Sequence, residues 1–152
     1  MPPINNPRQR RASPPLDLEN PAAALKAIDA LLAADPEDVS ALNNRGLVLG
    51  RLGRYDEAIA ALEKVIALNA DDAAAWNNTA VVLARQGKHR DAVAAAERAT
   101  GLDPASVEAW INYGKCLGKT GKFSEAAKAF AAADRIDPGA RARMPGWVEM
   151  VR

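Results

Sequence analysis

The apolar and small residues of this chain recur with a period of 34 residues. Three units follow one another without an insertion, at residues 39–72, 73–106 and 107–140. The fourth position holds a large apolar residue, the eleventh leucine and the fifteenth glycine: Leu42, Trp76 and Trp110; Leu49, Leu83 and Leu117; Gly53, Gly87 and Gly121. Valine and isoleucine never form the period-two runs typical of a strand, so each unit is predicted to be helical.

Each unit is predicted to contain two helices that cross closely. The glycine at the fifteenth position supplies a backbone conformation that other residues reach only with strain, so it marks the turn between them. Small residues at the eighth and twentieth positions allow the two axes to approach: Gly46, Ala80 and Gly114, and Ala58, Ala92 and Ala126. The N-caps of the first helices are predicted at Asp38, Asp72 and Ser106.

This pattern resembles the tetratricopeptide repeat (TPR) family, whose signature at this period is Trp–Leu–Gly–Tyr–Ala–Phe–Ala–Pro. The later signature positions hold Tyr55, His89 and Phe123, then Leu62, Ala96 and Phe130, and at the junctions Pro36, Pro104 and Pro138, with Ala70 replacing one proline. The resemblance implies an all-α fold, a right-handed α–α superhelix of about seven helices. It would consist of three full repeats and a preceding half repeat.

The two ends of the chain depart from the repeat. Residues 16–38 are predicted to be an N-terminal half repeat, which contains a lone second helix that begins at Asn20–Pro21. Residues 1–15 are rich in proline and arginine and are predicted to be a disordered arm. Residues 141–152 begin like a fourth repeat, which Pro145–Gly146 interrupts. Their apolar side chains either cap the last helix or mediate self-association, and they are Trp147, Met150 and Val151.

Composition excludes several classes of protein. Alanine accounts for 34 of the 152 residues and aromatic residues for 5%, which favours closely packed helices with few bulky core groups. A net charge of +1 argues against nucleic-acid binding. The single cysteine, Cys116, rules out an internal disulfide or a thiolate metal cluster. No window resembles a membrane span or a secretory signal, so we expect a cytoplasmic protein without membrane insertion.

The family resemblance places the ligand-binding concave face at the second, fifth, sixth, ninth, twelfth and thirteenth positions. Helical geometry supports this grouping, because positions two, six, nine and thirteen share one face. The sixth position is Asn44, Asn78 and Asn112, and the thirteenth is Arg51, Arg85 and Lys119. Asn43 and Asn77 occupy the fifth position on the same face. These eight residues are the candidate peptide-binding site.

The asparagine row admits three interpretations. An amide side chain offers a donor and an acceptor, which suits the backbone of a peptide ligand. A similar asparagine ladder in the TPR superhelix of a nucleocytoplasmic glycosyltransferase holds extended substrates, and this similarity implies backbone binding here. The asparagines could instead form hydrogen bonds between neighbouring repeats, or be inherited by duplication without a use.

The basic row admits two interpretations. It either binds acidic side chains or a terminal carboxylate, or it complements the helix dipoles near helix ends. Glu108 and Ser40 weaken a uniformly basic picture of the face. One TPR subgroup binds the carboxylate tails of chaperones through a clamp of basic residues and asparagines. Of that pattern only Asn78 matches this chain, and Glu108 is acidic where the pattern requires a lysine.

The leading functional hypothesis is a non-catalytic protein-interaction module that binds an extended, possibly acidic, peptide segment of a partner with micromolar affinity at best. The alternative is a self-assembling scaffold, a homo-oligomer that uses the exposed faces of its terminal helices. No catalytic constellation, metal site or cofactor motif is found. His89 is interpreted as a packing residue at a turn, and Cys116 as a small core group. Arg45 departs from the apolar seventh position, and either points outward or pairs with an acid near the half repeat, such as Glu37.

Overall fold

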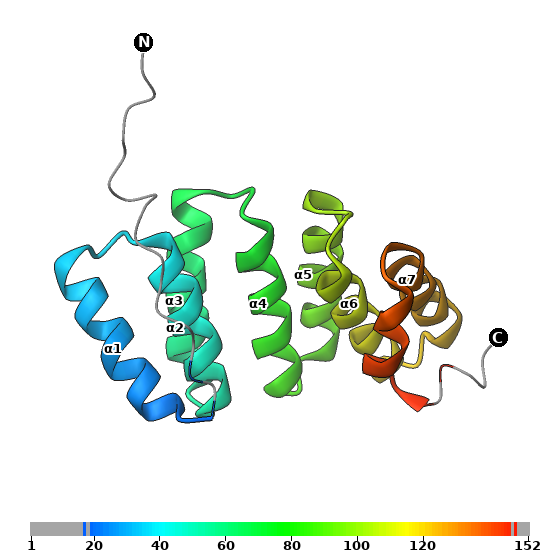
Figure 1. Cartoon of the computed structure of the whole chain (residues 1–152), viewed down its shortest axis with the longest axis horizontal. Coiled ribbons are helices and arrows are strands. Elements are labelled where there is room, and N and C mark those ends of the chain that lie inside the picture. Colours follow the sequence, from blue (N-terminus) through cyan, green and yellow to red (C-terminus); the bar gives the residue numbers. More distant parts are fainter. Residues whose placement is uncertain (1–16, 18, 147, 149–152) are drawn as a thin grey trace, which may run out of the picture.

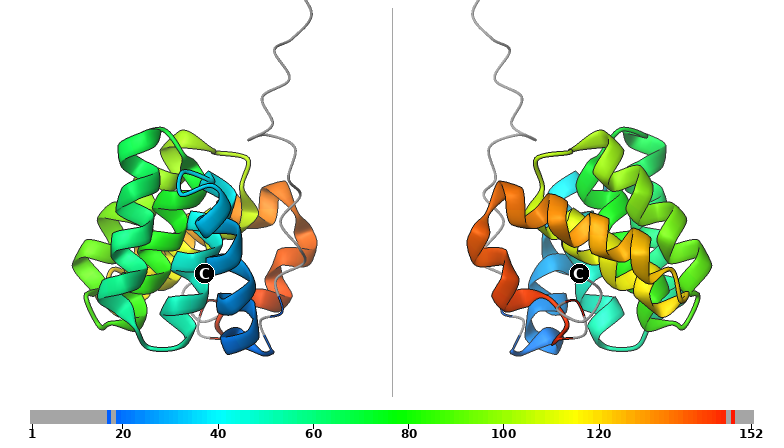
Figure 2. Two further views of the ribbon diagram at one scale, coloured as in Figure 1. Left: turned by 90° about the vertical axis from the view of Figure 1, so that its left-hand side faces the viewer. Right: turned by 90° about the vertical axis from the view of Figure 1, so that its right-hand side faces the viewer.

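The computed structural model describes residue 17, residues 19–146 and residue 148. Its elements are α1 (Pro21–Ala34), α2 (Val39–Arg51), α3 (Tyr55–Leu68), α4 (Ala73–Arg85), α5 (His89–Leu102), α6 (Val107–Lys119), α7 (Phe123–Ile136) and the 3-10 helix η2 (Pro138–Arg143). The helices follow one another in chain order along the long axis of the molecule, with α1 and α7 at opposite ends (Figures 1 and 2). No strand occurs in the described ranges. The fold is therefore the predicted all-α solenoid.

The first helix of each repeat begins at a side-chain cap. Asp38 accepts a hydrogen bond from the backbone N–H of Ala41 at 3.0 Å, and Asp72 accepts one from Ala75 at 2.8 Å. Ser106 Oγ accepts the equivalent bond from Ala109 at 3.2 Å. Each cap satisfies one of the backbone donors that a helix leaves unpaired at its start. The three predicted caps are confirmed.

The two helices of a repeat are joined by a turn that needs glycine. Gly53, Gly87 and Gly121 have φ values of 75°, 84° and 81°, a region that residues with a Cβ rarely adopt. The residue after each glycine donates its N–H to a carbonyl in the preceding helix, as from Arg54 to Leu49 at 2.9 Å. This bond closes the end of the first helix and starts the second without a side-chain cap.

The close helix crossing within each repeat depends on a matched pair of residues. A Cβ added at Gly46 would lie 2.5 Å from Leu62 Cγ, and one at Gly114 would lie 2.7 Å from the Phe130 ring. These glycines therefore leave room for a large side chain at the twenty-fourth position. In the second repeat the eighth position is Ala80 and the twenty-fourth is Ala96, and both are fully buried. At the crossing, a leucine or phenylalanine at the twenty-fourth position thus faces a glycine at the eighth. In the second repeat, alanine occupies both positions.

Tryptophan at the fourth position ties one repeat to the preceding junction. The indole N–H of Trp110 donates to the Pro104 carbonyl at 2.9 Å, and that of Trp76 donates to the Ala70 carbonyl at 2.8 Å. The bond uses only the carbonyl, so it persists where Ala70 replaces the expected proline. It satisfies the polar atom of an otherwise apolar ring.

The half repeat packs on the first full repeat through α1. Asn20 accepts a hydrogen bond from the Ala23 N–H at 3.2 Å, so α1 begins as predicted. Arg45 pairs with an acid of this half repeat, but the partner is Asp29, with Nε 3.0 Å from Oδ1, and not the suggested Glu37. Asp29 and Arg45 both lie mid-helix in adjacent helices joined by a short connection, whereas Glu37 lies in that connection.

The segment after α7 forms η2 instead of a fourth helical repeat. Asp137 caps its start by accepting the Gly139 N–H at 2.9 Å. Ala140 and Val148 are buried against the α6–α7 pair, and Met144 packs against the same cluster. The described part of this segment therefore covers the end of the array. Residues 1–15, Trp147, Met150 and Val151 lie outside the described residues, so the predictions made for them stay predictions.

We expect Gly46→Ala to destabilise the protein by about 1–2 kcal/mol, because overpacking against Leu62 outweighs the gain of about 1 kcal/mol in helix propensity. Gly101→Ala is the matched control. It is also helical, but an added Cβ would meet no atom within 4 Å. We expect it to stabilise the protein by about 0.5–1 kcal/mol. Urea unfolding of both variants measures the difference, and equal stability would contradict the packing argument.

Candidate binding groove

One hollow lies on the side of the array that the first helices of the repeats line. We call it the central hollow, and its volume is about 590 Å³. Its lining residues come from α2, α4, α6 and the start of α5: Leu47, Arg51, Asn77, Asn78, Val81, Ala84, Arg85, His89, Glu108, Asn112, Lys115, Cys116 and Lys119. Eleven of these thirteen occupy the six register positions predicted for the ligand-binding face.

Six of the eight candidate site residues line the central hollow: Asn77, Asn78, Asn112, Arg51, Arg85 and Lys119. Asn43 and Asn44, the remaining two, do not line it. Leu47, Val81 and Lys115 were not singled out, although all three occupy the ninth position of the predicted face. His89 and Cys116 lie outside the predicted register. The charge of Lys115 at a position of the predicted face is the sequence signal that identifies it as a binding candidate.

The asparagines have unequal surroundings. Asn112 donates from Nδ2 to Asn77 Oδ1 at 3.0 Å, which links α6 to α4. This bond is the inter-repeat interaction that the sequence left as an alternative. Asn78 makes no side-chain hydrogen bond to any residue of the described part, although it is half-buried beside them. Asn43 is buried, and its Oδ1 has no partner among those residues. Asn78 is therefore the asparagine of the hollow best placed to accept a new partner.

The central hollow carries four cations without an ion-pair partner among the described residues. They are Arg51 on α2, Arg85 on α4, and Lys115 and Lys119 on α6. The one carboxylate of the lining, Glu108, is paired with the guanidinium of Arg143 from η2. An anionic ligand would thus meet positive charge from three helices, because the carboxylate of Glu108 is already paired with Arg143. The second interpretation of the basic row, as partners of the helix dipoles, is compatible with this arrangement.

Cys116 and His89 also line the central hollow. Cys116 is buried, and that burial raises the pKa of its thiol to about 11. The thiol is accordingly protonated and unreactive at neutral pH. His89 begins α5 and is half-buried, with its Nδ1 unpartnered among the described residues. The burial of Cys116 agrees with the predicted small core group, whereas the packing role of His89 stays a prediction.

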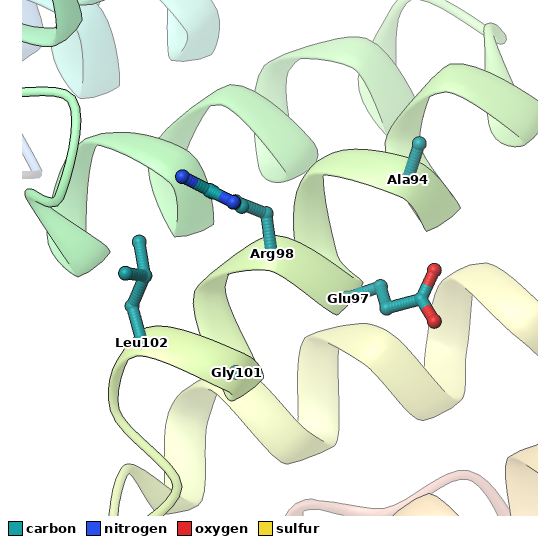
Figure 3. Close-up of a pocket in the computed structure, with 5 residues that line it drawn as sticks. All are labelled: Ala94, Glu97, Arg98, Gly101 and Leu102. Carbon is teal, nitrogen blue, oxygen red and sulfur yellow. The ribbon is translucent and has the colours of Figure 1, made fainter.

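The structure contains two further hollows. One of about 430 Å³ continues from the central hollow past α6 and is lined by Lys115, Gly118, Lys119 and Pro145. The other, of about 450 Å³, is formed entirely by α5, and Figure 3 shows Arg98 and Leu102 projecting from it. There Arg98 is already engaged by Asp71 at 3.6 Å and by the Trp76 ring at 5.8 Å from the ring centroid. The α5 hollow therefore offers less free charge than the central hollow.

Two other kinds of site are absent from the described ranges, a metal-binding cluster and a membrane-spanning helix. No group of three or more histidine, cysteine, aspartate or glutamate side chains there is arranged to hold a metal ion. None of the helices described is both long and apolar enough to cross a membrane.

Comparisons with known proteins identify the repeat. The sequence model of the tetratricopeptide repeat family matches residues 16–73, 45–89 and 80–141. A crystal structure of MamA is 25% identical over 80% of this chain and 71% of that one, with a TM-score of 0.68. A structure of MamA from residue 41 to its end, from Desulfovibrio magneticus RS-1, is 22% identical over 80% and 69% of the two chains, with a TM-score of 0.69. No curated protein matches the sequence. These matches indicate no catalytic family.

We expect iodoacetamide to alkylate Cys116 in the folded protein roughly a hundredfold more slowly at pH 8 than it alkylates an unstructured cysteine peptide. The reason is that a thiol with a pKa of about 11, compared with an ordinary value of 9.0, is rarely a thiolate at that pH. The rate should rise with pH until the pH passes this pKa. Mass spectrometry over a time course measures it, with the urea-unfolded chain as control. A folded-state rate equal to that of the peptide would contradict the burial of Cys116.

Proposed function

Because this chain belongs to the tetratricopeptide repeat family, a family of protein-interaction modules, we propose that it binds an extended acidic segment of a partner protein in the central hollow. Four cations without an ion-pair partner among the described residues surround this one hollow on three helices: Arg51, Arg85, Lys115 and Lys119. Carboxylates on an extended peptide would pair with these groups through charge-assisted hydrogen bonds. Longer-range attraction would also accelerate the encounter.

The asparagines contribute to the proposed site through the peptide backbone. The side chain of Asn78 has no hydrogen-bond partner among the described residues, so its amide can donate to one ligand carbonyl and accept from one ligand N–H. Asn112 donates one hydrogen bond to Asn77, but its side-chain carbonyl oxygen can still accept a hydrogen bond from the ligand. We therefore assign backbone recognition mainly to Asn78, with a smaller share for Asn112. The contribution of Asn44, which lies outside the central hollow, is proposed to be minor.

The size of the site limits its affinity. A net hydrogen bond contributes roughly 0.5–1.5 kcal/mol, and exposed ion pairs contribute roughly 0–1 kcal/mol each. A few contacts of each kind correspond to micromolar binding at best, about −8 kcal/mol. Tighter association with the partner would require a second contact surface.

Self-assembly is the second candidate function, and the exposed face of α1 favours it. This lone helix leaves six alanines exposed: Ala22, Ala23, Ala27, Ala30, Ala33 and Ala34. The burial of Val148 at the other end removes one apolar group from the surface that self-association would use. Light scattering over a concentration series distinguishes the two functions, and a monomer at every concentration would remove self-assembly.

For the groove cations, we expect each of Arg51→Gln, Arg85→Gln and Lys119→Gln to weaken binding of an acidic peptide about three- to fivefold at low salt. The probe is octaglutamate with an N-terminal fluorescein and an amidated C-terminus, and fluorescence anisotropy measures its dissociation constant. Arg135→Gln is the matched control, because Arg135 is exposed on α7 and does not line the central hollow. An equal loss of affinity for Arg135→Gln would mean that peptide binding depends only on the total charge of the protein and not on the cations of the central hollow.

For the asparagines, we expect Asn78→Ala to weaken octaglutamate binding roughly two- to tenfold without lowering stability, because its side chain forms no hydrogen bond with the described residues. Asn112→Ala should also cost about 0.5–1.5 kcal/mol of stability, since it breaks the bond to Asn77. Asn44→Ala is the control at the same register outside the hollow, with affinity near wild type. Fluorescence anisotropy measures the affinity of each variant, and thermal unfolding measures its stability. Unchanged affinity of Asn78→Ala would refute backbone recognition by this residue.

A further inference from the structure

The carboxylate of Glu108 is an anomaly in the central hollow. It is the one acid among thirteen lining residues, and it stands on α6, the helix that also carries Lys115 and Lys119. The equivalent second-position residues of the other repeats are uncharged, Ser40 and Ala74. An unpaired carboxylate here would repel the carboxylates of an acidic ligand and lower the positive potential of the hollow.

Arg143 removes this conflict from outside the repeats. Its Nη1 contacts Glu108 Oε1, and its Nη2 lies 3.3 Å from Asp137 Oδ2. The guanidinium is thus held between an acid on α6 and the acid that caps η2. Arg143 itself does not line the central hollow, so it acts on the ligand surface through Glu108.

The position of Arg143 is set by packing. Ala140 is fully buried, and Met144 and Val148 pack with it against the α6–α7 pair. These contacts place η2 across the end of the array, next to the first turn of α6 where Glu108 lies. The same segment brings Pro145 to the hollow shared with Lys115 and Lys119. The apolar cap and the ligand-binding face are therefore physically connected.

We propose that the segment after α7 determines the charge selectivity of the groove, with Arg143 neutralising Glu108 so that the central hollow accepts acidic ligands. Arg143 is a positioning residue in this proposal, since its effect reaches the ligand only through Glu108. The inference rests on the proposed function, because it presupposes that an acidic segment binds in the central hollow. It goes beyond that function by assigning a role in ligand selection to a segment outside the repeats.

The test is a double-mutant cycle with the labelled octaglutamate at about 20 mM ionic strength, where screening is weak. The variants are Arg143→Gln, Glu108→Gln and the two combined. We expect Arg143→Gln to weaken binding about three- to fivefold, Glu108→Gln to match or slightly exceed wild-type affinity, and the double variant to behave like Glu108→Gln. Arg141→Gln is the matched control, because Arg141 lies in the same 3-10 helix and pairs with Asp134 at 2.8 Å. It should leave the affinity unchanged.

A purely structural ion pair would give a different pattern. Glu108→Gln and Arg143→Gln both break the pair, so a structural role predicts the same loss of affinity for each single variant and no recovery in the double variant. A double variant as weak as Arg143→Gln would show that Arg143 contacts the peptide directly, and this result also overturns the proposal. Unchanged affinity of Arg143→Gln would likewise overturn the proposal.

The same titrations separate this inference from the proposed function. If Arg85→Gln leaves octaglutamate affinity at the wild-type value, the peptide does not bind in the central hollow and the proposed function fails. If Arg85→Gln weakens binding but the cycle through Glu108 and Arg143 shows no coupling, only the present inference fails. Thermal unfolding of every variant confirms that the affinities refer to folded protein.

Discussion

The close crossing of the two helices in each repeat is the constraint on which the rest of this structure depends. Protein interiors are packed as densely as organic crystals, so a crossing at this distance tolerates little change in volume. Gly46 and Gly114 leave room for the large side chains of Leu62 and Phe130. The Ala80–Ala96 pair fills the equivalent crossing with two small side chains. The crossing fixes how the first helices α2, α4 and α6 are presented side by side. The central hollow is the surface that these three helices create.

The sorting of charge, and not its total, gives the hollow its chemistry. The chain has 20 basic and 19 acidic residues, a balance that by itself predicts no affinity for anions. The repeat register nevertheless places four cations on one face, and Arg143 engages the carboxylate that opposes them. Because the register repeats every 34 residues, a basic residue at one position recurs on every first helix. A nearly neutral chain can therefore present a selective surface.

Much of the fold follows from local rules that a single sequence displays. The caps at Asp38, Asp72 and Ser106 and the turn glycines depend on residues close in sequence, so their positions were predictable. The register also predicts most of the lining of the hollow. The partners of polar side chains were less predictable, because they depend on how helices from different repeats face each other. Asn112 thus bonds to Asn77, and Arg45 pairs with Asp29 instead of Glu37. The contact of Arg143 with Glu108 lies in an irregular segment after Pro138, where no periodic pattern applies.

Binding of an extended acidic segment in the central hollow can be located residue by residue in solution. Amide chemical-shift mapping of the isotope-labelled protein during titration with octaglutamate tests it most directly, since it reports the location of binding without any substitution. Binding in the central hollow should give the largest shifts on the hollow faces of α4 and α6, around Asn78, Arg85, Lys115 and Lys119. Largest shifts on α3, on α7 or on the part of α5 beyond His89, or no shifts at millimolar peptide, would contradict binding in the central hollow.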